Sequence, residues 1–99
     1  MAILEISITP LGTEGASFSS YVSDACKVVK DRGLKYQITP TATIIEGNVD
    51  DLMEVAKKMH ETPFNKGVNR VITNMTIDER IDKNMDLGNQ VQSVAKTIM

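Results

Sequence analysis

The sequence has one cysteine, no tryptophan and few other aromatic residues, which limits the kinds of cross-link, metal site and core it can form. Because Cys26 has no second cysteine to pair with, an internal disulfide and a Cys-x-x-Cys metal site are both ruled out. Aromatic residues make up only 4% of the chain, so the core is expected to be aliphatic, with the six methionines as adaptable filler. Cys26 itself lies among apolar neighbours and is expected to be a small buried residue rather than a nucleophile.

An excess of positive charge and a long apolar run are also missing. The net charge of −2 argues against broad electrostatic binding of nucleic acid, which needs a clustered basic surface. No apolar run approaches the roughly 20 residues of a membrane span. The first residues, MAILEISI, lack the basic segment of a signal peptide, so we expect a cytoplasmic protein. The 99 residues suit one domain, residues 1–99, with one modest core.

Residues 34–47, LKYQITPTATIIEG, predict a β-hairpin at the centre of the chain. β-Branched and aromatic residues dominate this stretch, and they suit a pleated strand. Pro40 is tolerated at the turn, where its missing N–H removes no ladder hydrogen bond. Amphipathic helix patterns precede and follow the hairpin, and strand patterns occupy residues 2–11 and 68–81. The element order is therefore β-α-β-β-α-β.

Three helices are predicted from their apolar periodicity and their caps. Ser17 is the expected N-cap of the first helix, and Gly33 follows its end. Asn48 or Asp50 caps the second helix, which ends near Pro63. The expected buried stripes are Phe18, Val22, Ala25 and Val29 in the first helix, Val49, Leu52, Met53, Ala56 and Met59 in the second, and Leu87, Val91, Val94 and Ile98 in a third, C-terminal helix.

This order predicts an α+β, ferredoxin-like sandwich with an extra C-terminal helix, in which two helices cover one face of a four-stranded antiparallel sheet. The expected helix-facing residues are Leu4, Ile6, Ile8, Tyr36, Ile38, Ala42, Ile44, Val71, Met75 and Ile77. The expected open face carries Glu5, Ser7, Thr9, Gln37, Thr39, Thr41, Thr43, Asn74 and Thr76, with Ile3, Ile45 and Ile72. Hydroxyls and amides outnumber charges there, so we expect a second sheet, a ligand or the third helix to cover this face.

Other functional readings of the sequence are weaker. The loop PLGTEG, residues 10–15, is a weak candidate for anion binding through backbone N–H groups, and it lacks the arginine of an acylphosphatase-like hydrolase. His60 has no second histidine at ligand spacing, so no metal site is expected. RNA-binding sheets display aromatic residues for base stacking, whereas this face displays hydroxyls. No Ser/His/Asp grouping is indicated by spacing, and no catalytic residue is predicted.

Several short motifs, taken in order, resemble those of the small thiamine-binding ferredoxin-like proteins. They are ISITPLGT, SSYV, GLKY, the T-x-x-E-G pattern of residues 43–47, HE at residues 60–61, RV at residues 70–71 and the I-D-x-R pattern of residues 77–80. The resemblance covers nearly the whole chain. Thr41-Ala42 is a departure, since many members have Met-Gly there, and this change affects the shape of the turn.

The resemblance implies binding of thiamine or its hydroxymethylpyrimidine part, without catalysis and without another cofactor. It also implies homodimers formed by sheet packing, and often homotetramers. A purely structural or regulatory oligomer with no small ligand is the alternative. No nucleic acid and no membrane is expected as a partner.

Thiamine chemistry selects candidate residues from the sequence. The aminopyrimidine needs hydroxyls or amides, for which Ser7, Thr9, Thr43 and Asn74 are candidates. The cationic or protonated nitrogen needs a carboxylate, supplied by Glu5 or Glu46, and the rings need an apolar slot, supplied by Tyr36 and Ile45. We expect these side chains to converge on the open face at a subunit interface. The alternatives are that Tyr36 belongs to the core, that Glu46 is solvated or caps a helix, and that Thr43 is only a strand former.

Overall fold

The computed structural model describes residues 1–12 and 18–82 of the chain. In order, its elements are β1 (Ala2–Leu11), α1 (Phe18–Arg32), β2 (Tyr36–Ile38), β3 (Thr43–Gly47), α2 (Val49–Glu61), the short 3₁₀ helix η1 (Thr62–Lys66) and β4 (Arg70–Glu79). The predicted third helix at residues 87–98 and the predicted N-cap Ser17 lie outside the described residues. None of the described helices is long and apolar enough to cross a membrane.

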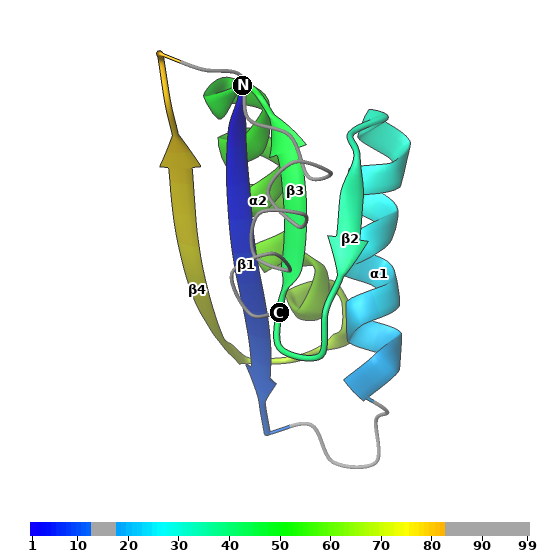
Figure 1. Cartoon of the computed structure of the whole chain (residues 1–99). Coiled ribbons are helices and arrows are strands. Elements are labelled where there is room, and N and C mark those ends of the chain that lie inside the picture. Colours follow the sequence, from blue (N-terminus) through cyan, green and yellow to red (C-terminus); the bar gives the residue numbers. More distant parts are fainter. Residues whose placement is uncertain (13–17, 83–99) are drawn as a thin grey trace.

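The four strands form one antiparallel sheet in the order β2-β3-β1-β4. Figure 1 shows α1 and α2 on the same side of this sheet, with β4 at the edge farthest from α1. The predicted α+β ferredoxin-like arrangement is therefore confirmed. β1 and β4 are long and pair along all ten of their residues, whereas β2 and β3 are short.

The core lies between the sheet and the two helices. Its largest fully buried side chains are Leu4, Ile6, Val29, Ile45, Leu52, Val55, Met59 and Pro63. β1 alternates as predicted, because Leu4 and Ile6 point to the helices and Glu5 points away. Burying these aliphatic side chains supplies the main favourable term of folding, at about 25 cal/mol per Å² of apolar surface.

The predicted facing of β3 is wrong by one residue. Ile45 is 0% exposed and Thr43 is 7% exposed, so both belong to the helix face rather than to the open face. The register explains this result, because Ile45 lies opposite Leu4 and Thr43 opposite Ile6, and directly opposed residues share a face. Ile44, predicted to face the helices, therefore lies on the open face. The predicted helix-facing Ala42 lies outside the strand, in the turn before it.

The helix predictions hold in most details. Asn48 is the N-cap of α2, because its Oδ1 accepts a hydrogen bond from the backbone N–H of Asp51 at 2.8 Å. The buried stripe of α2 is Leu52, Val55, Ala56 and Met59, so Met53 was wrongly included and Val55 was missed. In α1, Ala25 and Val29 are buried as predicted, together with Tyr21 and Cys26.

Candidate functional site

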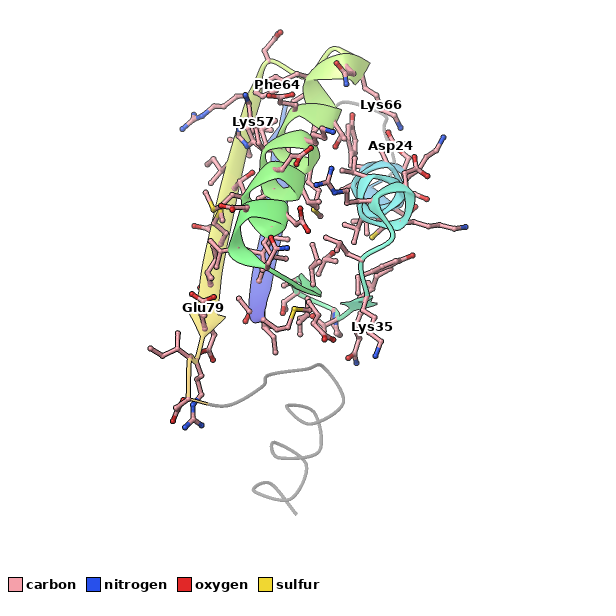
Figure 2. All side chains as sticks on the ribbon, turned by 90° about the horizontal axis from the view of Figure 1, so that it is seen from above. Asp24, Lys35, Lys57, Phe64, Lys66 and Glu79 are labelled. Carbon is pink, nitrogen blue, oxygen red and sulfur yellow. The ribbon has the colours of Figure 1, made fainter. Side chains whose placement is uncertain are left out.

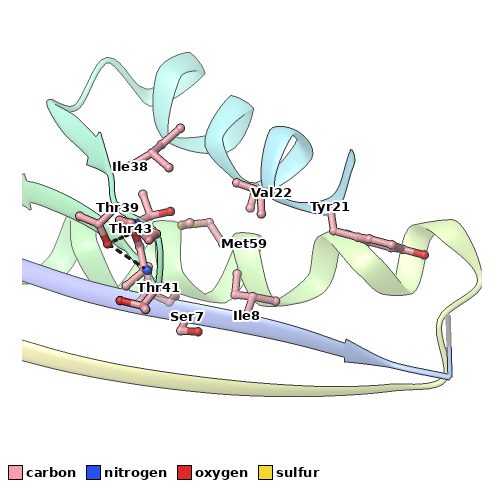
Figure 3. A pocket seen from close by; sticks show the side chains of 13 residues that line it. Ser7, Ile8, Tyr21, Val22, Ile38, Thr39, Thr41, Thr43 and Met59 are labelled. Carbon is pink, nitrogen blue, oxygen red and sulfur yellow. Dashed lines mark hydrogen bonds between the residues drawn. The ribbon is translucent and has the colours of Figure 1, made fainter. Parts of the chain in front are cut away.

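A cavity of about 130 Å³ lies between β1, α1 and the turn that joins β2 to β3. Figure 3 shows its lining from close by. The lining residues are Ile6, Ser7, Ile8, Tyr21, Val22, Ala25, Ile38, Thr39, Pro40, Thr41, Ala42, Thr43 and Met59. A dry cavity of about 150 Å³ in another protein binds benzene, so this one has the size for a single six-membered ring.

The cavity exists because β1 is much longer than its neighbour β3. The described pairing of β1 with β3 ends at Ile6 and Thr43, although β1 continues to Leu11 beside β4. Beyond Ile6, the β3 side of β1 therefore has no strand partner among the described residues. Ser7 lines the cavity at this free strand edge, so the cavity reaches the boundary between the two faces of the sheet.

The turn at one end of the cavity is held by Thr39. Its Oγ1 donates a hydrogen bond to the carbonyl of Ala42 at 2.8 Å and accepts one from the Ala42 N–H at 3.1 Å. The backbone N–H of Thr39 donates to the same carbonyl at 2.8 Å. These hydrogen bonds engage the Thr39 hydroxyl within the turn. Thr39 therefore stabilises the turn that closes the cavity, and its hydroxyl is not offered to a ligand.

Thr43 presents a free hydroxyl to the cavity. Within the described part of the chain, Thr43 makes no side-chain hydrogen bond, and no buried polar side-chain atom is left without a partner. The hydroxyl of this largely buried residue must therefore be accessible, and the space beside it is the cavity. A donor or acceptor on a bound ring would pair with this group, because a buried polar group is costly without a partner.

The other walls of the cavity are apolar. Figure 3 shows Val22 and Ile38 on one side, Ile8 on the opposite side and Met59 between them. Ile38 is 56% exposed although it is aliphatic, so it forms part of the rim rather than of the core. An apolar slot with a few polar groups at one end is typical of small-molecule sites.

The eight residues predicted for the site do not all share one surface. Their strand positions place Glu5, Ser7, Thr9, Glu46 and Asn74 on the open face. Tyr36, Thr43 and Ile45 lie on the helix face instead, because Tyr36 lies opposite the fully buried Ile45. Tyr36 packs against the core, as in the alternative interpretation of this residue. Convergence of all eight on the open face is therefore wrong, and Ser7 and Thr43 are the two that line the cavity.

On the open face, register brings some of the predicted residues together and separates others. Ser7 and Asn74 are directly opposite one another, and Glu5 is the next open-face residue on β1. Glu46 lies opposite Ile3, four residues along β1 from Ser7, which is about 13 Å at the usual strand rise. Glu5 is therefore the carboxylate nearer to the cavity. It is exposed and makes no ion pair with any described residue.

Charge on the open face favours a cationic group near the cavity. Arg70 is the only basic residue that the four described strands place on this face. It lies opposite Leu11, at the far end of β1. Among residues 1–12 and 18–82, no group of three or more His, Cys, Asp or Glu side chains is placed so that it could hold a metal ion.

Sequence reasoning missed Tyr21, Val22 and Ile38 as lining residues, and it placed Ile44 on the wrong face. No local pattern marks the first three as lining, because apolar residues at helical or strand spacing are normally core. The sequence feature that could have indicated the cavity is the turn ITPTAT, with three threonines around Pro40. The strand that follows this turn, β3, is too short to pair with the whole of β1.

Comparison with known proteins gives the chain a family. The family described as "Thiamine-binding protein" matches residues 4–95. The UPF0045 protein YqgV of Bacillus subtilis is 45% identical over 97% of this chain and 96% of its own length. The UPF0045 protein of Methanothermobacter thermautotrophicus is 37% identical over 99% of this chain and the whole of its own length.

Solved structures share the fold of this chain. The hypothetical protein MJ1052 of Methanocaldococcus jannaschii superposes with a TM-score of 0.85, at 36% identity, over 95% of both chains. A putative thiamine biosynthesis/salvage protein of Thermotoga maritima has the same fold, with a TM-score of 0.77 at 18% identity over 94% of this chain and 97% of its own. The resemblance read from the short motifs is thus confirmed, and the chain belongs to the thiamine-binding protein family.

Proposed function

We propose that this protein binds thiamine, or its hydroxymethylpyrimidine part, without catalysing a reaction. The observation that carries the proposal is the ring-sized cavity between β1, α1 and the β2–β3 turn, with the accessible hydroxyl of Thr43 at one end. Membership of the thiamine-binding family supports the choice of ligand.

The aminopyrimidine ring fits the chemistry of the cavity. The ring is flat and has apolar faces, which suit the walls formed by Val22, Ile38 and Ile8. Its amino group and ring nitrogens lie at the edge, where they need hydrogen-bonding partners, and Thr41 and Thr43 offer hydroxyls. We place the pyrimidine inside the cavity for these reasons.

The thiazolium ring then lies at the free edge of β1. A methylene group joins the two rings, so the second ring leaves the cavity past Ser7 and reaches the open face. Glu5 is the next open-face residue on the same strand and supplies a carboxylate for the positive charge. Asn74, opposite Ser7, supplies an amide beside the same spot.

Self-association through the open face belongs to the same proposal. Ile3, Leu11, Ile44 and Ile72 are the aliphatic residues that the described strands place on this face, which is otherwise polar, and Ile72 is 42% exposed. Packing two such faces together would bury these side chains and enclose the thiazolium ring. The proposal is therefore a homodimer formed by sheet packing, with the ligand close to the subunit interface.

Thermal unfolding with and without thiamine tests this function. At about 100 times its dissociation constant, a ligand adds about 2.7 kcal/mol of stability, which raises the Tm of a domain of this size by roughly ten degrees. We expect such a rise with thiamine and with hydroxymethylpyrimidine, and none with hydroxyethylthiazole alone at the same concentration.

A triple variant provides the decisive control. Changing Ser7→Ala, Thr43→Val and Asn74→Ala together should abolish the rise while the protein remains folded. If the triple variant bound thiamine as tightly as the wild type, the proposed site would be wrong. If millimolar thiamine produced no shift in the wild type, the structural oligomer without a small ligand would become the better account.

A further inference from the structure

The hydrogen bonds of the β2–β3 hairpin determine which way each residue of β1 turns its backbone N–H and C=O. The N–H of Glu46 donates to the carbonyl of Lys35 at 3.0 Å, so Glu46 turns its backbone toward β2. Successive residues of an antiparallel strand alternate in this direction, so the odd-numbered residues of β3 turn toward β1. Because Thr43 lies opposite Ile6, the even-numbered residues of β1 turn toward β3 and the odd-numbered ones toward β4.

Ile8 turns its N–H and C=O toward the β3 side but has no partner there among the described residues. Pairing with β3 ends at Ile6 and Thr43, and no backbone hydrogen bond joins Ile8 to the turn before β3. The next hydrogen-bonded pair along these strands would join Ile8 to Thr41, but the turn at Pro40 leads the chain away before this pair forms. Both residues line the cavity instead, and Figure 3 shows β1 continuing past Ile8, away from Thr41 and Thr43.

Pro10 supports this assignment. It is the next even-numbered residue of β1, so its ring nitrogen, which carries no hydrogen, lies on the same unpaired side. A proline inside a paired stretch removes a ladder hydrogen bond. β1 and β4 nevertheless pair without interruption through Pro10 and Val71, because the hydrogen bonds to β4 come from the odd-numbered residues of β1.

An unpaired N–H and C=O of one strand residue are complementary to the edge of an aminopyrimidine. In thiamine, the 4′-amino group is a donor and the adjacent ring nitrogen N3′ is an acceptor. A partner residue in an antiparallel sheet offers the same combination of one donor and one acceptor. The cavity beside Ile8 has the size of one six-membered ring, so such a ring can occupy the place of a further strand residue.

We propose that the backbone of Ile8 recognises the aminopyrimidine edge of the ligand. The Ile8 N–H donates to N3′, and the Ile8 C=O accepts from the 4′-amino group. The remaining ring nitrogen, N1′, lies across the ring from the amino group, where the hydroxyl of Thr43 donates to it. This recognition rests on the proposed function and adds the ligand class to it, because the pairing selects 4-aminopyrimidines over 4-oxopyrimidines.

Amide hydrogen exchange measured by NMR tests the pairing without any substitution. In the free protein, the Ile8 amide should exchange rapidly, whereas the amides of Ser7 and Thr9, which face β4, should exchange slowly. Thiamine at about 100 times its dissociation constant leaves about 1% of the sites empty, so it should slow exchange at Ile8 by up to about 100-fold. The matched control is the amide of Thr73, which β4 turns away from β1 and whose rate should not change.

Ligand analogues test the direction of the two hydrogen bonds. Oxythiamine has an oxo group in place of the 4′-amino group and a hydrogen on N3′, so its donor and acceptor are exchanged. We expect it to bind at least about 100-fold more weakly than thiamine, because both backbone groups of Ile8 would lose their partners. Pyrithiamine keeps the aminopyrimidine and has a pyridinium in place of the thiazolium, so it should bind within a few-fold of thiamine. Isothermal titration calorimetry measures all three ligands.

A proline variant removes the donor from the protein. Ile8→Pro deletes the N–H that faces the cavity and keeps the ladder to β4, as Pro10 does two residues later. We expect thiamine to bind at least about tenfold more weakly, and more weakly than to Ile8→Ala, which shortens the side chain but keeps the N–H. Val71→Pro makes the matched change at an outward-turned position of β4 and should leave the affinity unchanged. Circular dichroism checks that each variant is folded.

The outcomes separate this proposal from thiamine binding itself. An Ile8 amide that exchanges as slowly as that of Ser7 in the free protein would overturn the proposal. Thiamine binding that leaves exchange at Ile8 unchanged, or equal affinities for oxythiamine and thiamine, would also overturn it while the proposed function stands. If neither thiamine nor hydroxymethylpyrimidine bound, the proposed function would be wrong, and this pairing with it.

Discussion

At the scale of single residues, Thr43 shows how one strand position can serve both a core and a site. Its Cβ points to the helix face, opposite Ile6, and the residue is largely buried. Its hydroxyl nonetheless stays accessible, because the cavity begins where β3 ends. A threonine at such a position lowers the stability of the fold little only if its hydroxyl forms a hydrogen bond with water or a ligand.

Thr43→Val removes this hydroxyl with little change of shape. A ligand group that has lost its hydrogen-bonding partner costs about 1–3 kcal/mol, so we expect thiamine to bind about tenfold more weakly or worse. The matched variant Thr43→Ser keeps the hydroxyl and should keep most of the affinity. Isothermal titration calorimetry measures both. Equal affinity of the valine variant and the wild type would remove Thr43 from the site.

At the scale of elements, the unequal lengths of the strands create the candidate site. β1 has ten residues and β3 has five, and β2 stops at Ile38. The ITPTAT turn therefore folds back before the sheet reaches Leu11, and the space beside β1 is closed by α1 rather than by a strand. A longer β3 would fill this space with a strand partner and remove the cavity.

The register of β3 has a measurable consequence for stability. Ile45→Ala deletes a fully buried side chain and should lower the free energy of unfolding by about 2–5 kcal/mol. Ile44→Ala makes the same deletion on the open face and should cost each subunit about 1 kcal/mol or less. Urea unfolding at one protein concentration compares the two variants. An equal or larger loss for Ile44→Ala, at a protein concentration low enough that the subunit is monomeric, would contradict the register.

At the scale of the whole molecule, the described residues that line the cavity come from several elements of one chain. β1, α1, the β2–β3 turn and Met59 of α2 all belong to the same subunit (Figure 3). Figure 2 shows the two helices lying side by side over the sheet. The proposed self-association through the open face and the proposed ligand site therefore meet near Ser7 and Asn74, which lie opposite one another.

Stoichiometry follows from this arrangement. We expect one thiamine for each chain, whatever the size of the oligomer, because described residues of a single subunit line the pyrimidine cavity. Titration calorimetry at protein concentrations well above the dissociation constant gives the ratio directly. One ligand for every two chains would instead place the site on a twofold axis between subunits.

Much of this could be predicted from the sequence, for identifiable reasons. Alternation in β1 and in β4, the Asn48 cap and the apolar stripes are local patterns, and each was sufficient to predict its element. The facing of β3 could not be predicted, because the run TATII contains β-branched residues at both parities and two registers fit equally well. The predicted site inherited this error through Thr43 and Ile45. Subunit association, the absence of catalysis and the cytoplasmic location stay predictions.

The sequence by itself determined the order of the elements, the two-layer sandwich and the family, because periodicity, caps and short motifs are properties of neighbouring residues. Only the tertiary structure decided which face Thr43 and Ile45 occupy, because that depends on their partners in β1, far away in the chain. It also decided where the cavity lies, since a cavity results from the difference in length between strands that the sheet brings together.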